Sequence, residues 1–146
     1  MPEQKSFVRY LTHPEVVIDP TIPVPQWHLS PKGRVCAEIA ARKEWLRNTT
    51  QIISSAERKA METAEIIAAQ TGIEVEIREA THENDRSATG VLPQAEFQML
   101  ADQFFAHPMT SIRGWERAID AQARIVRAVE TVLARNQPGD ILIIGH

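Results

Sequence analysis

Two histidines follow strand-like runs of this chain. His13 comes directly after the β-rich residues 7–12, and His146 ends the apolar run at residues 140–146. A neutral imidazole can act as a nucleophile, and a second imidazole can donate a hydrogen bond to the group under attack. A lone histidine after a strand is most often an incidental surface or packing residue. The partners at the same edge of the fold therefore decide whether this chemistry is available.

Hydroxyl, basic and acidic side chains follow the other strand-like runs. Ser55 follows the run at residues 51–54, and Lys59 lies in the first turn of the next expected helix. The polar loop after the run at residues 73–77 contributes Glu83. These groups include an acid for proton transfer and a cation near a helix start, where anions bind favourably.

The sequence motifs of other common enzyme classes are missing. There is no glycine-rich nucleotide loop of either common type and no Gly-x-Ser-x-Gly motif. His82-Glu83 begins like a zinc-protease helix, but Arg86 stands where the second histidine would be. The single cysteine, Cys36, can form neither an internal disulfide nor a cysteine-based zinc site. We therefore expect no metal site and no cofactor.

Strand-like and helical patterns alternate along the chain. The strand-like runs are residues 7–12, 51–54, 73–77 and 140–144, and the helical patterns cover residues 31–47, 57–70, 94–105 and 115–135. Four prolines between residues 13 and 30 favour an extended loop there. The alternation predicts an α/β domain with a mostly parallel sheet. Because sites in such sheets form at the carboxyl ends of the strands, the residues named above are expected to meet.

Composition narrows the class of protein. The chain has 146 residues, a formal net charge of −3 and 43% hydrophobic residues, which suits one domain over residues 1–146. The charge argues against nucleic-acid binding, and no apolar run is long enough to cross a membrane. A cytoplasmic protein is the expectation, and a homodimer stays open. Because chains seldom stop on a core strand, we expect the natural polypeptide to continue beyond His146.

The run from Ser54 to Ala64 resembles a motif of the histidine phosphatase superfamily, the phosphoglycerate-mutase-like enzymes. There the second strand ends in Ser-Ser, a basic residue follows in the first helical turn, and Ala-x-(Gln/Glu)-Thr-Ala comes next. The matching residues here are Ser54, Ser55, Lys59, Ala60, Glu62, Thr63 and Ala64. Lys59 stands where the family usually has arginine.

Three further segments agree with this resemblance. Residues 27–34 resemble the stretch that opens the family's first helix, and residues 114–124 resemble its Gly-Glu-Ser helix start. Residues 143–146 resemble the strand that delivers its second histidine. The similarity spans residues 7–146 in the family's order, and it implies a three-layer α/β/α sandwich.

The resemblance also implies a mechanism and a set of residues. In the family, a histidine after the first strand attacks phosphorus, and water then hydrolyses the phosphohistidine. His13 takes the nucleophile's place, His146 that of the second histidine, and Lys59 that of the helix-borne arginine. The family carries its proton donor in the loop after the third strand. Glu83 is our preferred acid there, although Glu79 and Asp85 lie close by.

This chain departs from the family at the nucleophile. The family's Arg-His-Gly is replaced by Thr12-His13-Pro14, so one phosphate-binding arginine is missing. Arg58, Arg86 and Arg113 are candidates to replace it, because they lie at a helix start or in loops. We expect Thr12 and Arg86 to contact phosphate beside Lys59. Arg9 is a poor substitute because an extended strand places it about 13 Å from His13, at roughly 3.3 Å per residue. A register that aligns Arg9-Tyr10 with Arg-His would remove the nucleophile, and we disfavour it.

The sequence thus predicts metal-independent hydrolysis of a phosphomonoester through phospho-His13. The expected substrate is a small phosphorylated molecule or a phosphoprotein. Two alternatives stay open. Because one phosphate-binding arginine is missing, the chain can be a weak or inactive relative that binds phosphate ligands. It can also be a phosphoglycerate-type mutase, which needs a closed pocket that excludes water.

Overall fold

Four parallel strands form the centre of the fold. The computed structural model describes residues 5–146. The strands are β1 (Val8–Thr12), β2 (Thr49–Ser54), β3 (Val75–Ile77) and β4 (Asp140–Gly145), in the spatial order β1-β4-β2-β3. Every pairing is parallel. The α/β prediction with a mostly parallel sheet is therefore confirmed.

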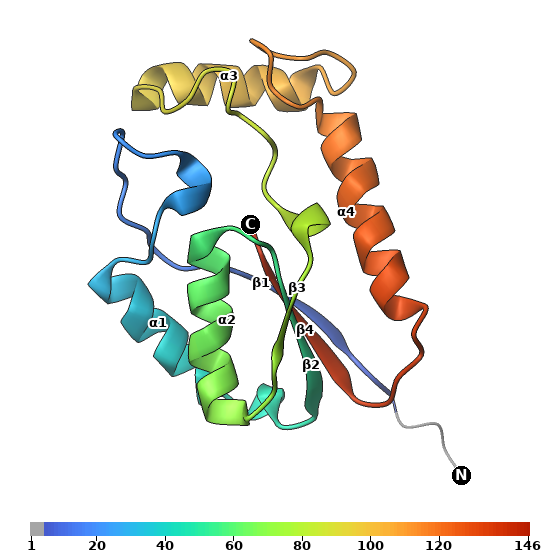
Figure 1. The fold of residues 1–146 in the computed structure, drawn as a ribbon. Helices are drawn as coiled ribbons and strands as arrows, with labels where there is room; N and C mark the ends of the chain where they lie inside the picture. Colours follow the sequence, from blue (N-terminus) through green and yellow to red (C-terminus); the bar gives the residue numbers. More distant parts are fainter. Residues whose placement is uncertain (1–4) are drawn as a thin grey trace.

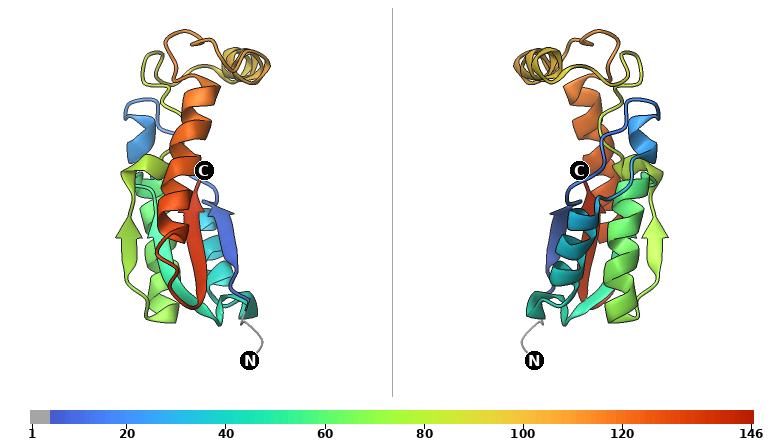
Figure 2. Two further views of the ribbon diagram at one scale, coloured as in Figure 1. Left: turned by 90° about the vertical axis from the view of Figure 1, so that its right-hand side faces the viewer. Right: turned by 90° about the vertical axis from the view of Figure 1, so that its left-hand side faces the viewer.

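Helices cover both faces of this sheet. They are α1 (Pro31–Ala41), α2 (Arg58–Thr71), α3 (Gln94–Ala106) and α4 (Ala118–Leu133), with short 3-10 turns η1 (Val24–Gln26), η2 (Glu44–Leu46) and η3 (Glu79–Thr81). Figure 1 shows α1 and α2 on one side of the sheet and α4 on the other, and both views in Figure 2 agree. The three-layer sandwich expected from the resemblance is present.

The side chains of β4 alternate between the two layers. Leu142 and Ile144 pack in the cluster that includes α2, whereas Ile141 and Ile143 pack against Val132 of α4. Such a nearly continuous apolar run is typical of a parallel strand buried on both faces. This burial fixes the register of β4 and so the position at which His146 emerges.

Helix α3 lies outside these layers, beyond the carboxyl edge of the sheet (Figure 2). It has a core of its own, made by Leu100, Phe104, Ile112 and Trp115. The segment between β3 and α4 therefore stands above the strand ends. That is where the sequence places the candidate acids.

The proline-rich segment between β1 and α1 is held against the start of α1. Val16 and Leu29 form an antiparallel bridge, and Ser30 caps α1 by accepting a hydrogen bond from the amide of Gly33. A Cβ atom on Gly33 would lie 2.1 Å from the carbonyl oxygen of Glu15, so only glycine permits this approach. The expected extended loop is therefore held against α1 by these contacts.

Two helix boundaries differ from prediction. Helix α1 ends at Ala41 instead of residue 47, because the chain turns through η2 and inserts Leu46 into the core beside α2. Helix α4 begins at Ala118 instead of residue 115, since Trp115 belongs to the α3 cluster. The strands agree with prediction to within two residues.

No helix among residues 5–146 is both long and apolar enough to span a bilayer. The single domain predicted for residues 1–146 includes four residues outside those described, and that boundary stays a prediction. The expectation of a longer natural polypeptide also stays a prediction.

Candidate active site

The two histidines meet at the carboxyl edge of the sheet. Thr12 of β1 pairs with Gly145 of β4, and the amide of His13 donates to the carbonyl of Gly145 at 3.1 Å. This register brings the rings of His13 and His146 together, with their centroids 5.2 Å apart and edge to face. The parallel pairing of β1 and β4 thus explains why histidines 133 residues apart in the sequence share one site.

The ring of His13 is held in one orientation. Its Nδ1 lies 2.8 Å from the carbonyl oxygen of Pro14. Because a carbonyl can only accept, Nδ1 carries the proton, and a neutral ring then has its lone pair on Nε2. Burial lowers the pKa of His13 below 6.5, and the nearby His146 and Lys59 lower it further, against the raising effect of the Pro14 hydrogen bond. His13 is therefore a neutral imidazole with a directed lone pair at neutral pH.

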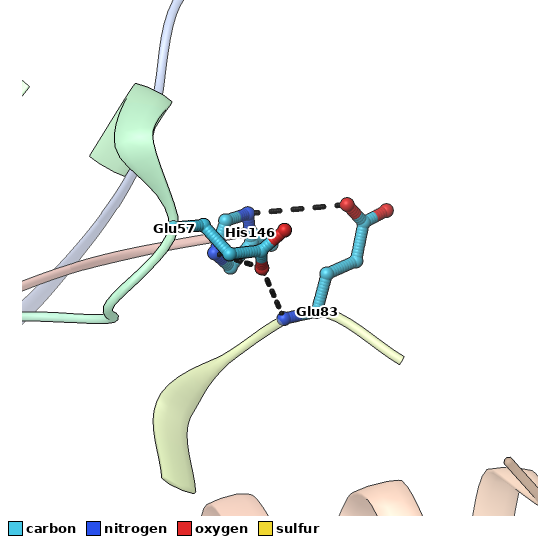
Figure 3. A group of neighbouring side chains, drawn as sticks. All are labelled: Glu57, Glu83 and His146. Atoms are coloured by element: carbon cyan, nitrogen blue, oxygen red, sulfur yellow. Dashed lines mark hydrogen bonds and ion pairs between the residues drawn. The ribbon is translucent and has the colours of Figure 1, made fainter. Parts of the chain in front are cut away.

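His146 is buried between two carboxylates, as Figure 3 shows. Its Nε2 lies 2.9 Å from Glu57 Oε2 and 2.8 Å from the Ser55 hydroxyl. Its Nδ1 is buried and has no hydrogen-bond partner among the described residues, although Glu83 Oε2 is 4.0 Å away. A proton on Nδ1 would give the site a donor that is free to bind a ligand oxygen.

Glu57 is a member of this cluster that the sequence did not point to. Its side chain is 7% exposed and accepts from His146 Nε2 and, at 2.8 Å, from the amide of Glu83. Burial alone would raise the pKa of Glu57, but these hydrogen bonds and the charges of His146 and Lys59 lower it to about 2. The signal was an acid at the N-cap of α2, two residues before Lys59 within the matched motif.

Lys59 lies in the site, but its ammonium group is already occupied. The side chain is 2% exposed, and Nζ lies 3.3 Å from Glu57 Oε1, 3.6 Å from Glu83 Oε2 and 3.4 Å from the carbonyl of Val24. Two of these contacts are hydrogen bonds, to Glu57 and Val24, and the third is an ion pair with Glu83. Lys59 is thus near a candidate phosphate position, but its charge is already compensated by two carboxylates.

Glu83 and Arg86 form the opposite wall of the site. Glu83 Oε1 lies 3.1 Å from the guanidinium of Arg86. The Cζ atom of that guanidinium lies 4.8 Å from the ring centroid of Phe97 and 5.9 Å from that of Trp115. The α3 cluster therefore holds Arg86, and Arg86 holds Glu83. The structure brings Glu83, Lys59 and both histidines close together and places Arg86 beside Glu83. The roles that the resemblance implies for these residues stay predictions.

The side chains of the other candidates make no hydrogen bond or ion pair with this group. Glu79 is exposed in η3, and Asp85 is exposed and accepts from the amide of Ser87 at 2.9 Å. Thr12 is exposed at the end of β1 and makes no side-chain hydrogen bond to the residues described. Arg9 pairs with Asp140 at the opposite edge of the sheet, at 2.7 Å, so it does not replace the missing arginine.

Three residues have the spacing of a metal site. Glu57, Glu83 and His146 each present a ligand atom within 4.8 Å of the others. The ammonium group of Lys59 already contacts both carboxylates, so a divalent cation would compete with it. The expectation of no metal here stays a prediction.

Comparisons with solved structures reveal similar folds. A mycobacterial glucosyl-3-phosphoglycerate phosphatase in complex with inorganic phosphate matches with a TM-score of 0.74 and 22% identity over 94% of this chain and 71% of its own. Bacillus stearothermophilus YhfR matches at 0.79 and 21% identity, covering 97% and 74%. A putative α-ribazole-5′-phosphate phosphatase from Escherichia coli matches at 0.73 and 13%, also covering 97% and 74%. These identities show the fold alone.

The sequence comparison is more specific. No curated protein matches the chain. The sequence pattern of the histidine phosphatase superfamily (branch 1) matches residues 24–146, which include Lys59, Glu83 and His146. The match begins after His13, in keeping with the altered Thr12-His13-Pro14 segment. Because the match covers most of the chain, this protein belongs to the histidine phosphatase superfamily (branch 1).

Proposed function

We propose that this protein hydrolyses phosphomonoesters through a phosphohistidine on His13. The observation that carries the proposal is the state of the His13 ring. Its Nδ1 is bound to the Pro14 carbonyl, and burial keeps the ring neutral, so a lone pair is available on Nε2 beside His146. Solved structures of similar fold include phosphatases, and one of them holds inorganic phosphate.

The proposed reaction has two steps. First, His13 Nε2 bonds to phosphorus and the bond from phosphorus to the ester oxygen breaks. Glu83 gives that oxygen a proton, which it must first take up from solvent in place of its ion pairs with Arg86 and Lys59. Second, a water oxygen bonds to phosphorus, the N–P bond breaks, and the water's proton passes to the Glu83 carboxylate. Inorganic phosphate leaves, and both residues return to their starting state.

The group that binds the phosphoryl oxygens differs from a double-arginine clamp. His146 Nδ1 is the buried polar atom without a partner at this position, and protonated it would donate to a phosphoryl oxygen. Lys59 can offer its full charge to the phosphoryl group only if that group draws it away from Glu57 and Glu83. We therefore expect slow turnover compared with an enzyme whose cations are free.

A second candidate rests on the same lysine. Because Glu57 and Glu83 neutralise Lys59, and Glu83 also neutralises Arg86, the site has little net positive charge for a dianion. A protein that binds phosphate ligands without hydrolysing them is therefore the runner-up.

The test uses p-nitrophenyl phosphate with chelator present and no added metal. Wild-type protein should release nitrophenol, and His13→Ala should not. His28→Ala is a matched control, because His28 Nδ1 also lies near the following residue's carbonyl, at 3.0 Å, and His28 is not among the residues of the site. Circular dichroism verifies the folding of both variants. Equal turnover in wild type and His13→Ala would reject His13 as the nucleophile, and no turnover in wild type would favour the binding protein.

A further inference from the structure

A cavity of about 760 Å³ opens beside the candidate site. It lies between the proline-rich segment and residues 79–91, and both Glu57 and Glu83 line it. Its volume is within the range of small-molecule sites, which is about 300–1,000 Å³. Because the acid that would protonate the leaving oxygen lines this cavity, the cavity is placed to receive the group attached to that oxygen.

One wall of the cavity is apolar. Its residues are Pro20, Ile22, Pro23, Val24 and Pro25, and Val91 adds an apolar side chain from the facing segment. This wall is fixed before any ligand binds: the indole of Trp27 donates to the carbonyl of Asp19 at 3.0 Å, and η1 shapes residues 24–26. A rigid apolar wall favours an apolar ligand because burial removes apolar surface from water at little ordering cost.

The other wall carries four acids beside His82, and its one arginine is already paired. Glu57, Glu79, Glu83 and Asp85 all line the cavity. The one arginine in the lining, Arg86, is paired with Glu83 and packed on aromatic rings. Hydrogen bonds to Ser87 lower the pKa of Asp85, so it is charged at neutral pH. A carboxylate or a second phosphate on the leaving group would face these acids unpaired, which is costly.

We infer that the leaving group of the substrate is apolar and carries no negative charge. This inference rests on the proposed function, because it takes the cavity as the leaving-group side of His13. It predicts discrimination by charge at constant size. Anionic leaving groups such as a phosphorylated hydroxy acid should be poor, and uncharged aromatic or aliphatic ones should be good.

The test compares two substrates of nearly equal shape, 2-naphthyl phosphate and its 6-carboxy analogue. We expect kcat/KM to be at least about tenfold higher for the uncharged substrate, within the range that pocket contacts supply. Ile22→Asp should remove most of this preference by lowering the rate on 2-naphthyl phosphate. Ile22→Leu is the matched control and should keep it. Equal kcat/KM values for the two substrates would overturn the inference while leaving the hydrolase activity established.

A binding measurement separates this inference from the proposed function. 2-Naphthol is fluorescent and is the product of the uncharged substrate, so its binding needs no turnover. Wild-type protein should bind 2-naphthol at least about tenfold more tightly than Ile22→Asp does, a difference of about 1.4 kcal/mol. If no substrate is hydrolysed but this difference appears, the hydrolase proposal fails and the apolar pocket stands. If the two proteins bind 2-naphthol equally, the pocket assignment is wrong whatever the activity.

Discussion

An ionisable side chain with little solvent exposure lies at each end of β4, Asp140 at its start and His146 just after its end. The two side chains differ in how many of their hydrogen bonds are made. At the amino end, Asp140 is 3% exposed and accepts from the amide of Phe7 at 2.9 Å and from Arg9 at 2.7 Å. At the carboxyl end, His146 is bound through Nε2, but its buried Nδ1 has no partner among the described residues. One strand thus carries a completed ion pair at one edge of the sheet and an incomplete cluster at the other.

The difference separates a structural role from a functional one. A buried polar group with all its bonds made stabilises the fold, whereas an unpaired buried atom costs free energy and needs another explanation. Glu57 and Glu83, the two carboxylates beside His146, also line the cavity, and the ligand we propose would supply the missing partner of His146 Nδ1. The following predictions test this contrast, starting with the largest expected effect.

Replacing His146 by Gln should lower kcat by about 10²–10³, the effect typical of removing one donor to a developing oxyanion. The folded structure should persist, because the ring is not required for the core of β4, which is formed by its apolar residues. Steady-state kinetics with p-nitrophenyl phosphate measures the change. An unchanged kcat in a folded variant would mean that Nδ1 does not serve the reaction.

Replacing Asp140 by Ala should lower the free energy of unfolding by about 1–3 kcal/mol, because the amide of Phe7 and the Arg9 guanidinium lose their buried acceptor. The rate of hydrolysis should stay the same, since Asp140 lies at the opposite edge from His13. Urea denaturation and kinetics on the same sample test both parts. A loss of activity without a loss of stability would contradict the structural role.

Replacing Glu57 by Gln should release Lys59 to bind a phosphoryl oxygen. We expect vanadate, as a phosphate mimic, to bind about tenfold more tightly, which corresponds to about 1.4 kcal/mol. Isothermal titration measures this affinity. Glu62→Gln is a control on the same helix, because Glu62 pairs with Arg34 outside the site. Weaker vanadate binding in Glu57→Gln would mean that Glu57 orients the site more than it blocks the lysine.

The low pKa of Glu57 predicts that the stability difference between wild type and Glu57→Gln depends on pH. The pKa of Glu57 is lowered from 4.5 to about 2 by folding, so its ionised form stabilises the native state above pH 4.5. That contribution is lost as the pH falls from 4.5 toward 2. The stability difference between wild type and variant should therefore shrink over this range, as urea denaturation at several pH values would show. A constant difference would place the stabilisation elsewhere.

The smallest predicted effect is on the acid limb of activity. Because the pKa of His13 is lowered from 6.5, the nucleophile stays neutral below that pH. The acid limb of kcat/KM should therefore have its midpoint below pH 6.5. A midpoint above 6.5 would show that a different group, or a protonated His13, controls the rate.

The sequence predicted most residues of the candidate site, but it did not predict which of their charges pair with one another. The strands and the matched motif predicted that His13, Lys59, Glu83 and His146 would meet, because parallel strands end at one edge. The pairing of Lys59 with Glu57 was not predicted. A lysine five residues after a strand indicates an available cation, and only the folded arrangement shows that an acid is paired with it. Charge compensation depends on side-chain directions that residue spacing does not specify.

The fold shows the same division. The apolar run of β4 and the cap Ser30-Pro31 predicted a strand and a helix start that the structure contains. The end of α1 was missed because the packing of Leu46 ends the helix early. The start of α4 was also missed, because Trp115 packs against residues of α3 and does not continue the helix. Tertiary packing, which local patterns do not record, decided both boundaries.

The central claim is that phosphorus becomes bonded to His13. The direct measurement mixes wild-type protein with p-nitrophenyl phosphate, quenches in alkali to preserve phosphohistidine, and locates the phosphoryl group by peptide mass spectrometry. We predict a gain of one phosphoryl group on the peptide that contains His13, and none in His13→Ala. Hydrolysis that proceeds with no label on His13, or with label on another histidine, would contradict the account.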